Sequence, residues 1–361
     1  MRKIYLLIII FIVAASNVFG QSNPVQTLIR EGIVLHDSAQ YVEAIEKFES
    51  ALKLNPKSAL ALYELSLTHL EMKNYDKALE YSTQVINLNE KNLLIGAYSV
   101  KSQALTESGN VSQAIRLLKE GLNRIGESHQ LHFNLALDYY KLNETDDALK
   151  HITRAIELDK SNSGAFLLSA YIWRDKGMWI RSVFSFQMFL LLEPDSRRSK
   201  NAFSEMLEAM FITEEGAEPL ERSFVQMQLG DRTEKKQKDV PPLAPNEEVD
   251  RDEIAAVVKS TVENLRKDHS EIECFRVFLE VNKVLIGELD YNIDDVEDED
   301  GFWNFYYPFF NFILNSNYFE TFARYISVSY FPESLEWWEE NTQEAQNFID
   351  WFEKGDSDDN Y

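Results

Sequence analysis

The sequence predicts an all-α protein, an α-solenoid of about five helix pairs followed by a smaller acidic, aromatic-rich helical domain. Three observations predict this fold class. A motif recurs about every 34 residues between 25 and 195, apolar residues recur at helical spacing in both halves, and the acidic excess falls in the second half. At 361 residues the chain is long enough for two or three structural units.

A small residue near the start of every second helix marks the repeat. A larger side chain there would force apart two antiparallel helices that cross closely. A single helix pair cannot bury its apolar face alone, so neighbouring pairs are expected to stack. The small residues are Ala44, Ala78, Ala114, Ala148 and Ser182, at separations of 34, 36, 34 and 34 residues.

The repeated residues resemble tetratricopeptide repeats over about half of the chain. The first unit carries Gly32, Tyr41, Ala44, Phe48, Ala51 and Pro56, and the fifth carries Ala170, Gly177, Trp179, Phe186 and Pro194. The resemblance implies a right-handed superhelix in which the first helix of each pair lines a concave groove. Two extra residues near Asn92 are expected to loosen the joint between the second and third units.

By the same resemblance, the side chains that face the groove are mainly apolar or aromatic. Relatives that hold a peptide's terminal carboxylate use lysine, arginine and asparagine there, so that mode is rejected. An amphipathic helix or an extended apolar segment suits this groove. The alternative is that the superhelix buries these residues between neighbouring units. The candidate partner-binding residues are Tyr63, Leu67, Phe133, Leu137, Tyr140 and Tyr171, within a wider set of Ile29, Ile33, Leu70, Ser99, Gln103, Thr106 and Leu167.

A double substitution in the predicted groove would test this expectation. Changing Tyr140 and Tyr171 together to aspartate is expected to abolish partner binding and to leave the fold intact.

The charge is distributed unequally. Residues 1–200 hold 23 basic and 22 acidic side chains, a net of +1, whereas residues 201–361 hold 13 and 38, a net of −25. The total of −24 argues against binding nucleic acid or an anionic membrane. The acidic half is expected to favour basic partners and to repel acidic ones.

The chain therefore divides into five predicted parts: a signal peptide at 1–20, the solenoid at 25–195, capping helices at 196–229, a linker at 230–250 and the acidic helical domain at 251–361. Within the last part, helices are expected at 252–266 and 271–288, with another beginning at Pro332. Residues 301–361 hold 20 aromatic side chains, more than a core of this size needs. Some are expected to meet a partner or to lie against the concave face of the chain's own repeats.

The N-terminus has the order of a secretory signal peptide. Arg2 and Lys3 precede an apolar run from Leu6 to Ala15, and small residues suit cleavage before Gln21. The run is too short to span a bilayer. No cysteine follows the cleavage site, so a lipid-anchored form is not expected. The mature protein is expected in the periplasm of a Gram-negative bacterium, without membrane insertion.

No catalytic constellation or cofactor motif stands out. The single cysteine, Cys274, excludes an intramolecular disulfide and a cysteine-rich zinc site. His129 and His132 lie three residues apart, but no third metal ligand is identifiable. The acidic stretch 290–300 opens like a calcium loop and then lacks its glycine and its glutamate, which favours a solvated loop. No metal and no cofactor are expected.

The sequence thus favours an exported, non-enzymatic scaffold that captures a protein or peptide segment in its groove. Two alternatives stay open. Aromatic residues of 301–361 could stack on sugar rings in an envelope glycan-binding protein, or an enzyme site could be formed in the C-terminal domain.

Overall fold

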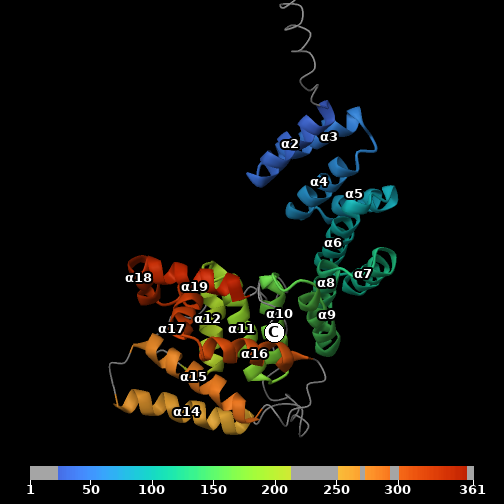
Figure 1. Ribbon diagram of the computed structural model, residues 1–361. Helices are drawn as coiled ribbons and strands as arrows, with labels where there is room; N and C mark the ends of the chain where they lie inside the picture. Colours follow the sequence, from blue (N-terminus) through green and yellow to red (C-terminus); the bar gives the residue numbers. More distant parts are fainter. Residues whose placement is uncertain (1–22, 213–250, 269–272, 293–300, 356–361) are drawn as a thin grey trace, which may run out of the picture. The chain divides into compact units, whose positions relative to one another are not determined.

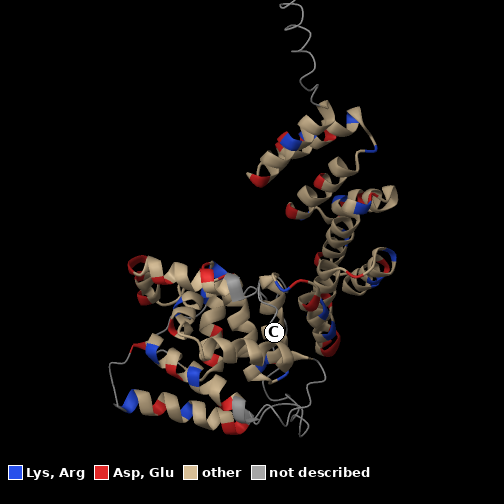
Figure 2. Cartoon of the chain, viewed as in Figure 1, with Lys and Arg blue, Asp and Glu red and all other residues tan. Residues whose placement is uncertain are grey.

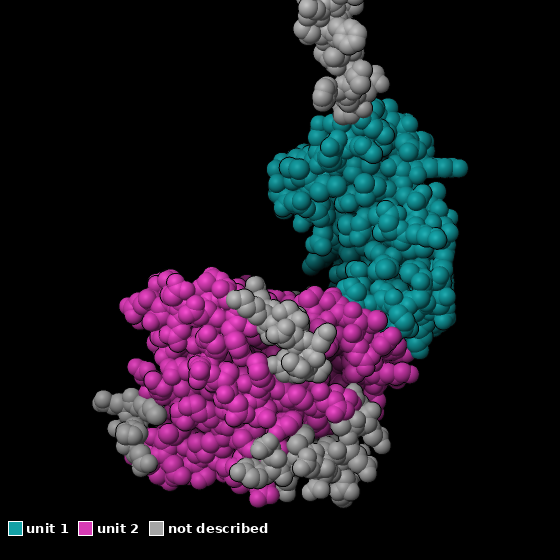
Figure 3. All heavy atoms as spheres, in the orientation of Figure 1, with its two compact units in different colours: residues 1–134 teal, residues 135–361 magenta. Residues whose placement is uncertain are grey.

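The computed structural model describes residues 23–212, 251–268, 273–292 and 301–355. The predicted signal peptide, the predicted linker and most of the acidic loop lie outside the described residues. Those that are described form seventeen helices and no strand, so the all-α prediction is confirmed. The chain divides into two compact units, unit 1 (residues 1–134) and unit 2 (residues 135–361) (Figure 3).

Five consecutive helix pairs occupy the predicted repeat region (Figure 1). They are α2 (Pro24–Asp37) with α3 (Tyr41–Leu54), α4 (Ala59–Glu71) with α5 (Tyr75–Leu88), α6 (Lys91–Glu107) with α7 (Val111–Ile125), α8 (His129–Lys141) with α9 (Thr145–Leu158), and α10 (Ser163–Asp175) with α11 (Trp179–Leu192). The boundary between the two units falls inside α8.

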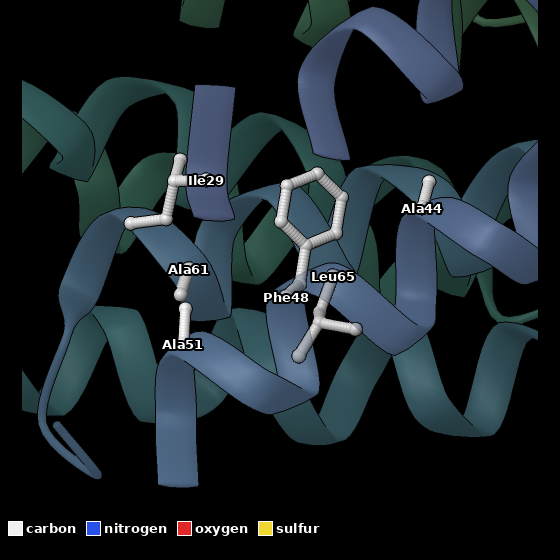
Figure 4. Packing of buried hydrophobic residues seen from close by; sticks show 6 residues of the cluster. All are labelled: Ile29, Ala44, Phe48, Ala51, Ala61 and Leu65. Atoms are coloured by element: carbon white, nitrogen blue, oxygen red, sulfur yellow. The ribbon is translucent and has the colours of Figure 1, made fainter. Parts of the chain in front are cut away.

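The marker residues of the repeat lie where the helices of a pair cross. Ala44, Ala78, Ala114, Ala148 and Ser182 have no exposed surface. In the first pair, a Cβ atom added at Gly32 would lie 2.5 Å from Cε1 of Phe48, so only glycine leaves room for that ring. Phe48 and Ala44 belong to a buried cluster that also contains Leu65 of α4 (Figure 4). The first and second pairs therefore share one core.

The breaks within the pairs share one backbone conformation. Each contains a residue with positive φ, and these residues follow the spacing of the repeat: Ala39, Lys73, Gly109, Asn143 and Gly177. A left-handed residue ends a helix and turns the chain. Glycine adopts this conformation without strain, and asparagine tolerates it.

The joint between the second and third pairs differs from the expected loose connection. The inserted residues lengthen α6 to 17 residues, against 13 for α4. The Arg124 guanidinium of α7 donates hydrogen bonds to the Asn89 side-chain oxygen at 2.6 Å and to the Ile86 carbonyl at 3.3 Å. It also reaches the Tyr98 hydroxyl at 3.4 Å, so α5, α6 and α7 are tied together by one side chain.

Within the range 196–229 that was predicted for capping helices, the structure describes one helix, α12 (Arg197–Ala209), and residues 213–229 lie outside the described residues. Glu193 connects α12 to the last pair, accepting hydrogen bonds from Ser163 of α10 at 2.9 Å and from Ser196 at 2.7 Å, and pairing with Arg198. The hydrogen bonds from Arg198, together with those from the serines, lower the pKa of Glu193 to about 2 despite its partial burial.

Six further helices follow in unit 2: α14 (Arg251–Asp268), α15 (Cys274–Asn292), α16 (Phe302–Leu314), α17 (Phe319–Ile326), α18 (Pro332–Glu340) and α19 (Thr342–Gly355). The helices expected at 252–266 and 271–288 are therefore present, as is the helix that begins at Pro332. The apolar face predicted for 271–288 is buried, with Phe275, Phe278 and Leu285 fully so.

These C-terminal helices pack against the last repeat pair. Every residue from Ile180 to Leu191 of α11 is buried. The ring centroid of Phe184 lies 4.6 Å from that of Phe310 of α16, and Gln187 is hydrogen-bonded to Asn282 of α15. The residues of α16 carry no charge, as its uniformly tan ribbon shows (Figure 2). The C-terminal helices thus complete the core around α11.

One expectation from the sequence was that some aromatic residues of 301–361 lie against the concave face of the repeats, and on α10 the observed contacts lie elsewhere. On α10, the side chains that meet α16 are Phe166 and Trp173, whose rings contact Tyr306 and Phe302. Phe166 and Trp173 are seven residues apart, so they share one side of the helix. Tyr171, the predicted groove residue, lies about 140° around the helix from Phe166. On α10, α16 therefore covers the side that carries Phe166 and Trp173.

Candidate partner-binding site

In unit 1, the candidate residues Tyr63 and Leu67 are half-buried on α4. Both pack against a buried cluster that contains Val100 and Ala104 of α6. The Tyr63 ring lies over Gly96, where an added Cβ atom would come within 2.6 Å of the tyrosine hydroxyl. The missing side chain at Gly96 therefore fixes where Tyr63 lies, and part of each candidate side chain stays accessible.

The other residues of the predicted inner face of unit 1 differ in exposure. Gln103 of α6 is exposed, and Phe133 of α8 is half-buried. Leu60, three residues before Tyr63 and not among the predicted residues, is 39% exposed. The residues that the packing removes from the surface are Ile29, Leu70 and Ser99. The accessible part of this face therefore combines apolar, aromatic and amide side chains.

In unit 2, Tyr140 and Tyr171 are not available to a partner. They are 2% and 1% exposed. The Tyr140 hydroxyl donates a hydrogen bond to Asp175 at 2.8 Å, and the Tyr171 hydroxyl donates one to Glu205 of α12 at 3.2 Å. Each tyrosine hydroxyl therefore connects its helix to the corresponding helix of the next unit, α8 to α10 for Tyr140 and α10 to α12 for Tyr171. For these two residues the alternative interpretation, burial between neighbouring units, is the correct one.

The other two predicted groove positions in unit 2 differ in exposure. Leu137 of α8 is half-buried, and Leu167 of α10 is 1% exposed. The Arg174 guanidinium lies 4.7 Å from the centre of the Tyr171 ring and pairs with Glu205. Burial raises the pKa of Glu205, and the nearby Arg174 opposes this rise. The inner side of α10 is thus closed by α12.

Sequence reasoning missed the acceptors of the two tyrosine hydroxyls. Asp175 follows Tyr140 by 35 residues and Glu205 follows Tyr171 by 34, as the hydrogen bonds show. A tyrosine on one first helix and an acidic residue one repeat later is a signal in the sequence. It indicates a polar joint between units rather than an open groove.

The electrostatics of unit 1 centre on Glu64, next to Tyr63. Burial, followed by the negative charge of Asp37, raises the pKa of Glu64 to about 7. Burial also raises the pKa of Tyr63, and the charge of Glu64 adds to this rise. The Thr68 hydroxyl donates a hydrogen bond to the Glu64 carbonyl at 2.8 Å, and His36 Nδ1 lies 2.9 Å from the same hydroxyl, which holds the end of α2 against α4. Negative charge is therefore disfavoured at this point of the inner face.

The described residues contain no group of three or more histidine, cysteine, aspartate or glutamate side chains that could hold a metal ion. His132 Nε2 lies 3.3 Å from a carboxylate oxygen of Glu127. Within the same described ranges, none of the helices combines the length and the apolar character needed to cross a membrane.

The aromatic residues of the C-terminal helices mostly contact one another or the last repeat. Tyr306 is buried, and its ring contacts those of Phe166 and Phe302. The most exposed large ring is Phe312, at 40%, and it stacks on Trp351 with centroids 5.1 Å apart. The excess of aromatic residues noted in the sequence is thus explained largely by the shared core with α10 to α12.

Comparison with known proteins identifies the repeats. Residues 35–92 match a family model described as tetratricopeptide repeat, and residues 129–162 match a second model with the same description. Tetratricopeptide repeats are therefore present in this chain, as the sequence predicted.

The similar proteins match part of this chain. A BBSome complex member of Bos taurus is 25% identical over 134 residues, which cover 37% of this chain and 25% of that protein. The Hsp70-Hsp90 organising protein of Plasmodium falciparum is 25% identical over 162 residues, covering 35% and 28%. The chain spans about a quarter of the length of these relatives. A thermophilic tetratricopeptide-repeat protein of Thermus thermophilus has 24% identity and a TM-score of 0.44, and the match covers 52% of this chain and 99% of that one.

Proposed function

We propose that this chain is a non-enzymatic scaffold that binds a protein segment on the inner face of unit 1. The tetratricopeptide repeats support a role in protein–protein interaction. The observation that carries the choice of surface is the position of Tyr63 and Leu67, which remain partly accessible on α4. In unit 2, by contrast, Tyr140 and Tyr171 are buried in joints between repeats.

The binding energy would come mainly from the burial of apolar and aromatic surface on Tyr63, Leu67 and Phe133. Burying about 100 Å² of apolar surface contributes roughly 2.5 kcal/mol before the cost of ordering the partner. Leu137, on the same helix as Phe133, is half-buried and is kept as a secondary candidate within unit 2. Tyr140 and Tyr171 are left out of the proposed contact surface.

We also propose export. Its support is the order of charged, apolar and small residues in 1–20, which is typical of a secretory signal peptide. Mass spectrometry of the mature N-terminus in a periplasmic extract tests it. A chain that begins at Gln21 supports export, and an intact Met1 terminus in the cytoplasmic fraction contradicts it.

Site-specific photo-crosslinking tests the proposed surface in the full chain. A photoreactive residue at Gln103, which is exposed on the predicted inner face, is compared with one at Glu46, which is exposed on α3. Neither position is in the core, so both variants should fold. We expect a covalent partner from position 103 and none from position 46.

Two further outcomes decide against the proposal. Equal products from both positions would mean that contact is not selective for the inner face. Products that persist unchanged when Tyr63 and Leu67 are both replaced by alanine in the Gln103 variant would show that the apolar side chains do not contribute.

A further inference from the structure

Three first helices of unit 1 end in a carboxylate at the same place in the repeat. Asp37, Glu71 and Glu107 are the last residues of α2, α4 and α6. Each stands seven residues before the small residue that marks its repeat, since 44 − 37, 78 − 71 and 114 − 107 all equal 7. All three are exposed. We call them the carboxylate edge.

The carboxylate edge lies on the same side of the helices as the inner face. Residues four apart in an α-helix share one face. On α4, Glu71 follows Leu67 by four residues, and Leu67 follows Tyr63 by four. On α2 and α6 the corresponding neighbours are Ile33 before Asp37 and Gln103 before Glu107. Each strip of inner-face side chains therefore ends in a carboxylate.

This placement is unfavourable for the isolated helices. The C-terminus of a helix carries partial negative charge, so an acidic residue in the last turn costs about 0.3–1 kcal/mol at low ionic strength. Within the described ranges, Asp37 and Glu71 have no cationic side chain within 4.0 Å. α8, by comparison, ends in Lys141, whose positive charge is favourable at the C-terminus of a helix. A cation that docks beside Asp37 or Glu71 would relieve the repulsion.

We propose that unit 1 binds a cationic amphipathic protein segment, whose apolar side chains lie on Tyr63 and Leu67 and whose lysine or arginine side chains pair with the carboxylate edge. The inference rests on the proposed function and adds the chemistry of the partner. It differs from the attraction expected of the acidic C-terminal half, because the selecting charges lie on the same helices as the apolar contacts.

The repeat spacing sets the pattern of the partner. Neighbouring packed helices lie about 8–10 Å apart. A helical segment covers this distance in about six residues and an extended one in about three. Basic residues recurring roughly once per such interval would meet successive carboxylates.

A binding measurement with defined peptides tests the inference. The full chain, as recovered from the cells that express it, is titrated with a fluorescent amphipathic helical peptide of leucine and lysine, and with a counterpart in which glutamate replaces lysine. The test variant combines Asp37→Asn, Glu71→Gln and Glu107→Gln. The control variant combines Glu43→Gln, Glu46→Gln and Glu49→Gln, which removes the same charge from exposed positions of α3.

We expect the lysine peptide to bind the unsubstituted chain and the glutamate peptide to bind at least tenfold more weakly. The test variant should raise the Kd of the lysine peptide at least tenfold, and the control variant less than threefold. Equal effects of the two variants would overturn the inference, since they would assign the attraction to overall charge. If replacing Tyr63 and Leu67 by alanine weakens binding while the test variant does not, the proposed function stands and the cationic partner is wrong.

Discussion

Gln187 and Asn282 form two hydrogen bonds with each other in the core of unit 2. The Gln187 side-chain nitrogen donates to Asn282 Oδ1 at 2.9 Å, and the Asn282 nitrogen donates back to Gln187 Oε1 at 3.3 Å. Neither residue has exposed surface. A buried amide needs a partner, and here each residue supplies it to the other. The pair therefore fixes how α15 docks on α11.

Replacing one member of this pair should destabilise unit 2. Asn282→Leu would leave the Gln187 amide buried without a partner, and we expect the free energy of unfolding to fall by about 2–4 kcal/mol. The double variant Gln187→Leu/Asn282→Leu should recover most of the loss, because both polar groups are removed. Urea denaturation followed by tryptophan emission measures this, since all six tryptophans lie in unit 2.

The control is Asn264→Leu on α14, where the asparagine is exposed and the expected change is within about 0.5 kcal/mol. A double variant as unstable as Asn282→Leu alone would mean that the shape of the amide pair, rather than its hydrogen bonding, is what the core requires.

The repeat architecture was predictable because its signals are local. The spacing of Ala44 and its equivalents reports the crossing of two helices that are adjacent in sequence. The docking of the C-terminal helices was also partly encoded. From Ile180 to Leu191, α11 carries apolar residues on all sides, and such a helix must be covered all round. Which segment covers it depends on contacts between residues about 100 positions apart, and no spacing in the sequence reports those.

The accessibility of the candidate site was less predictable. Leu67 and Tyr171 occupy equivalent places in the repeat, since the separations between them are 36, 34 and 34 residues. Leu67 keeps part of its surface, whereas Tyr171 is 1% exposed because α12 supplies Glu205 to its hydroxyl. Position in the repeat fixes the direction of a side chain. Its exposure is decided by the next helix.

Substitutions at Tyr171 separate these two roles. Tyr171→Phe removes one hydrogen bond to Glu205 and should cost about 1 kcal/mol of unfolding free energy. Tyr171→Asp would bury a carboxylate near Glu205 and remove the ring that contacts Phe186, so a loss of roughly 4 kcal/mol or more is expected. The fold would then not survive intact, contrary to the expectation from sequence. Tryptophan emission reports both variants.

The same acidic substitution at an open position provides the comparison. Gln103→Asp on the inner face of α6 should change stability by no more than about 0.5 kcal/mol, measured by circular dichroism. If Tyr171→Asp lowered the free energy of unfolding by no more than Gln103→Asp does, Tyr171 would not be buried as the structure describes.

The Arg124 side chain should stabilise the joint that the insertion lengthens. Arg124→Ala removes the hydrogen bonds to Asn89 and to the Ile86 carbonyl, and we expect a loss of about 1 kcal/mol because the guanidinium is largely exposed. Hydrogen exchange at the end of α5 and the start of α6 should become faster. Arg116→Ala, on the same helix and exposed, is the matched variant and should leave exchange there unchanged. If hydrogen exchange at this joint were equally fast in both variants, the Arg124 side chain would not be what stabilises the joint.

The raised pKa of Glu64 predicts how the stability of unit 1 depends on pH. Because burial and Asp37 raise the pKa to about 7, against 4.5 for an ordinary glutamate, the folded state binds a proton more tightly than the unfolded state. Glu64 therefore contributes stability below about pH 4.5, and this contribution is lost as the pH rises to about 7. Glu64→Gln, which stays neutral, should exceed the unsubstituted chain in stability at pH 8 by on the order of 2 kcal/mol and match it near pH 4.

Circular dichroism during urea denaturation measures this difference, with tryptophan emission marking the separate transition of unit 2. Asp37→Asn is the informative second variant. It removes the smaller cause of the shift, so it should reduce the stability gained by Glu64→Gln at pH 8 without abolishing it, because burial of Glu64 remains. His36 and Tyr63 also face this region, but Glu64→Gln leaves them in place in both chains that are compared. A gain from Glu64→Gln that is the same at pH 4 and pH 8 would mean that the pKa of Glu64 is the same in the folded and unfolded states, so that neither burial nor Asp37 shifts its titration.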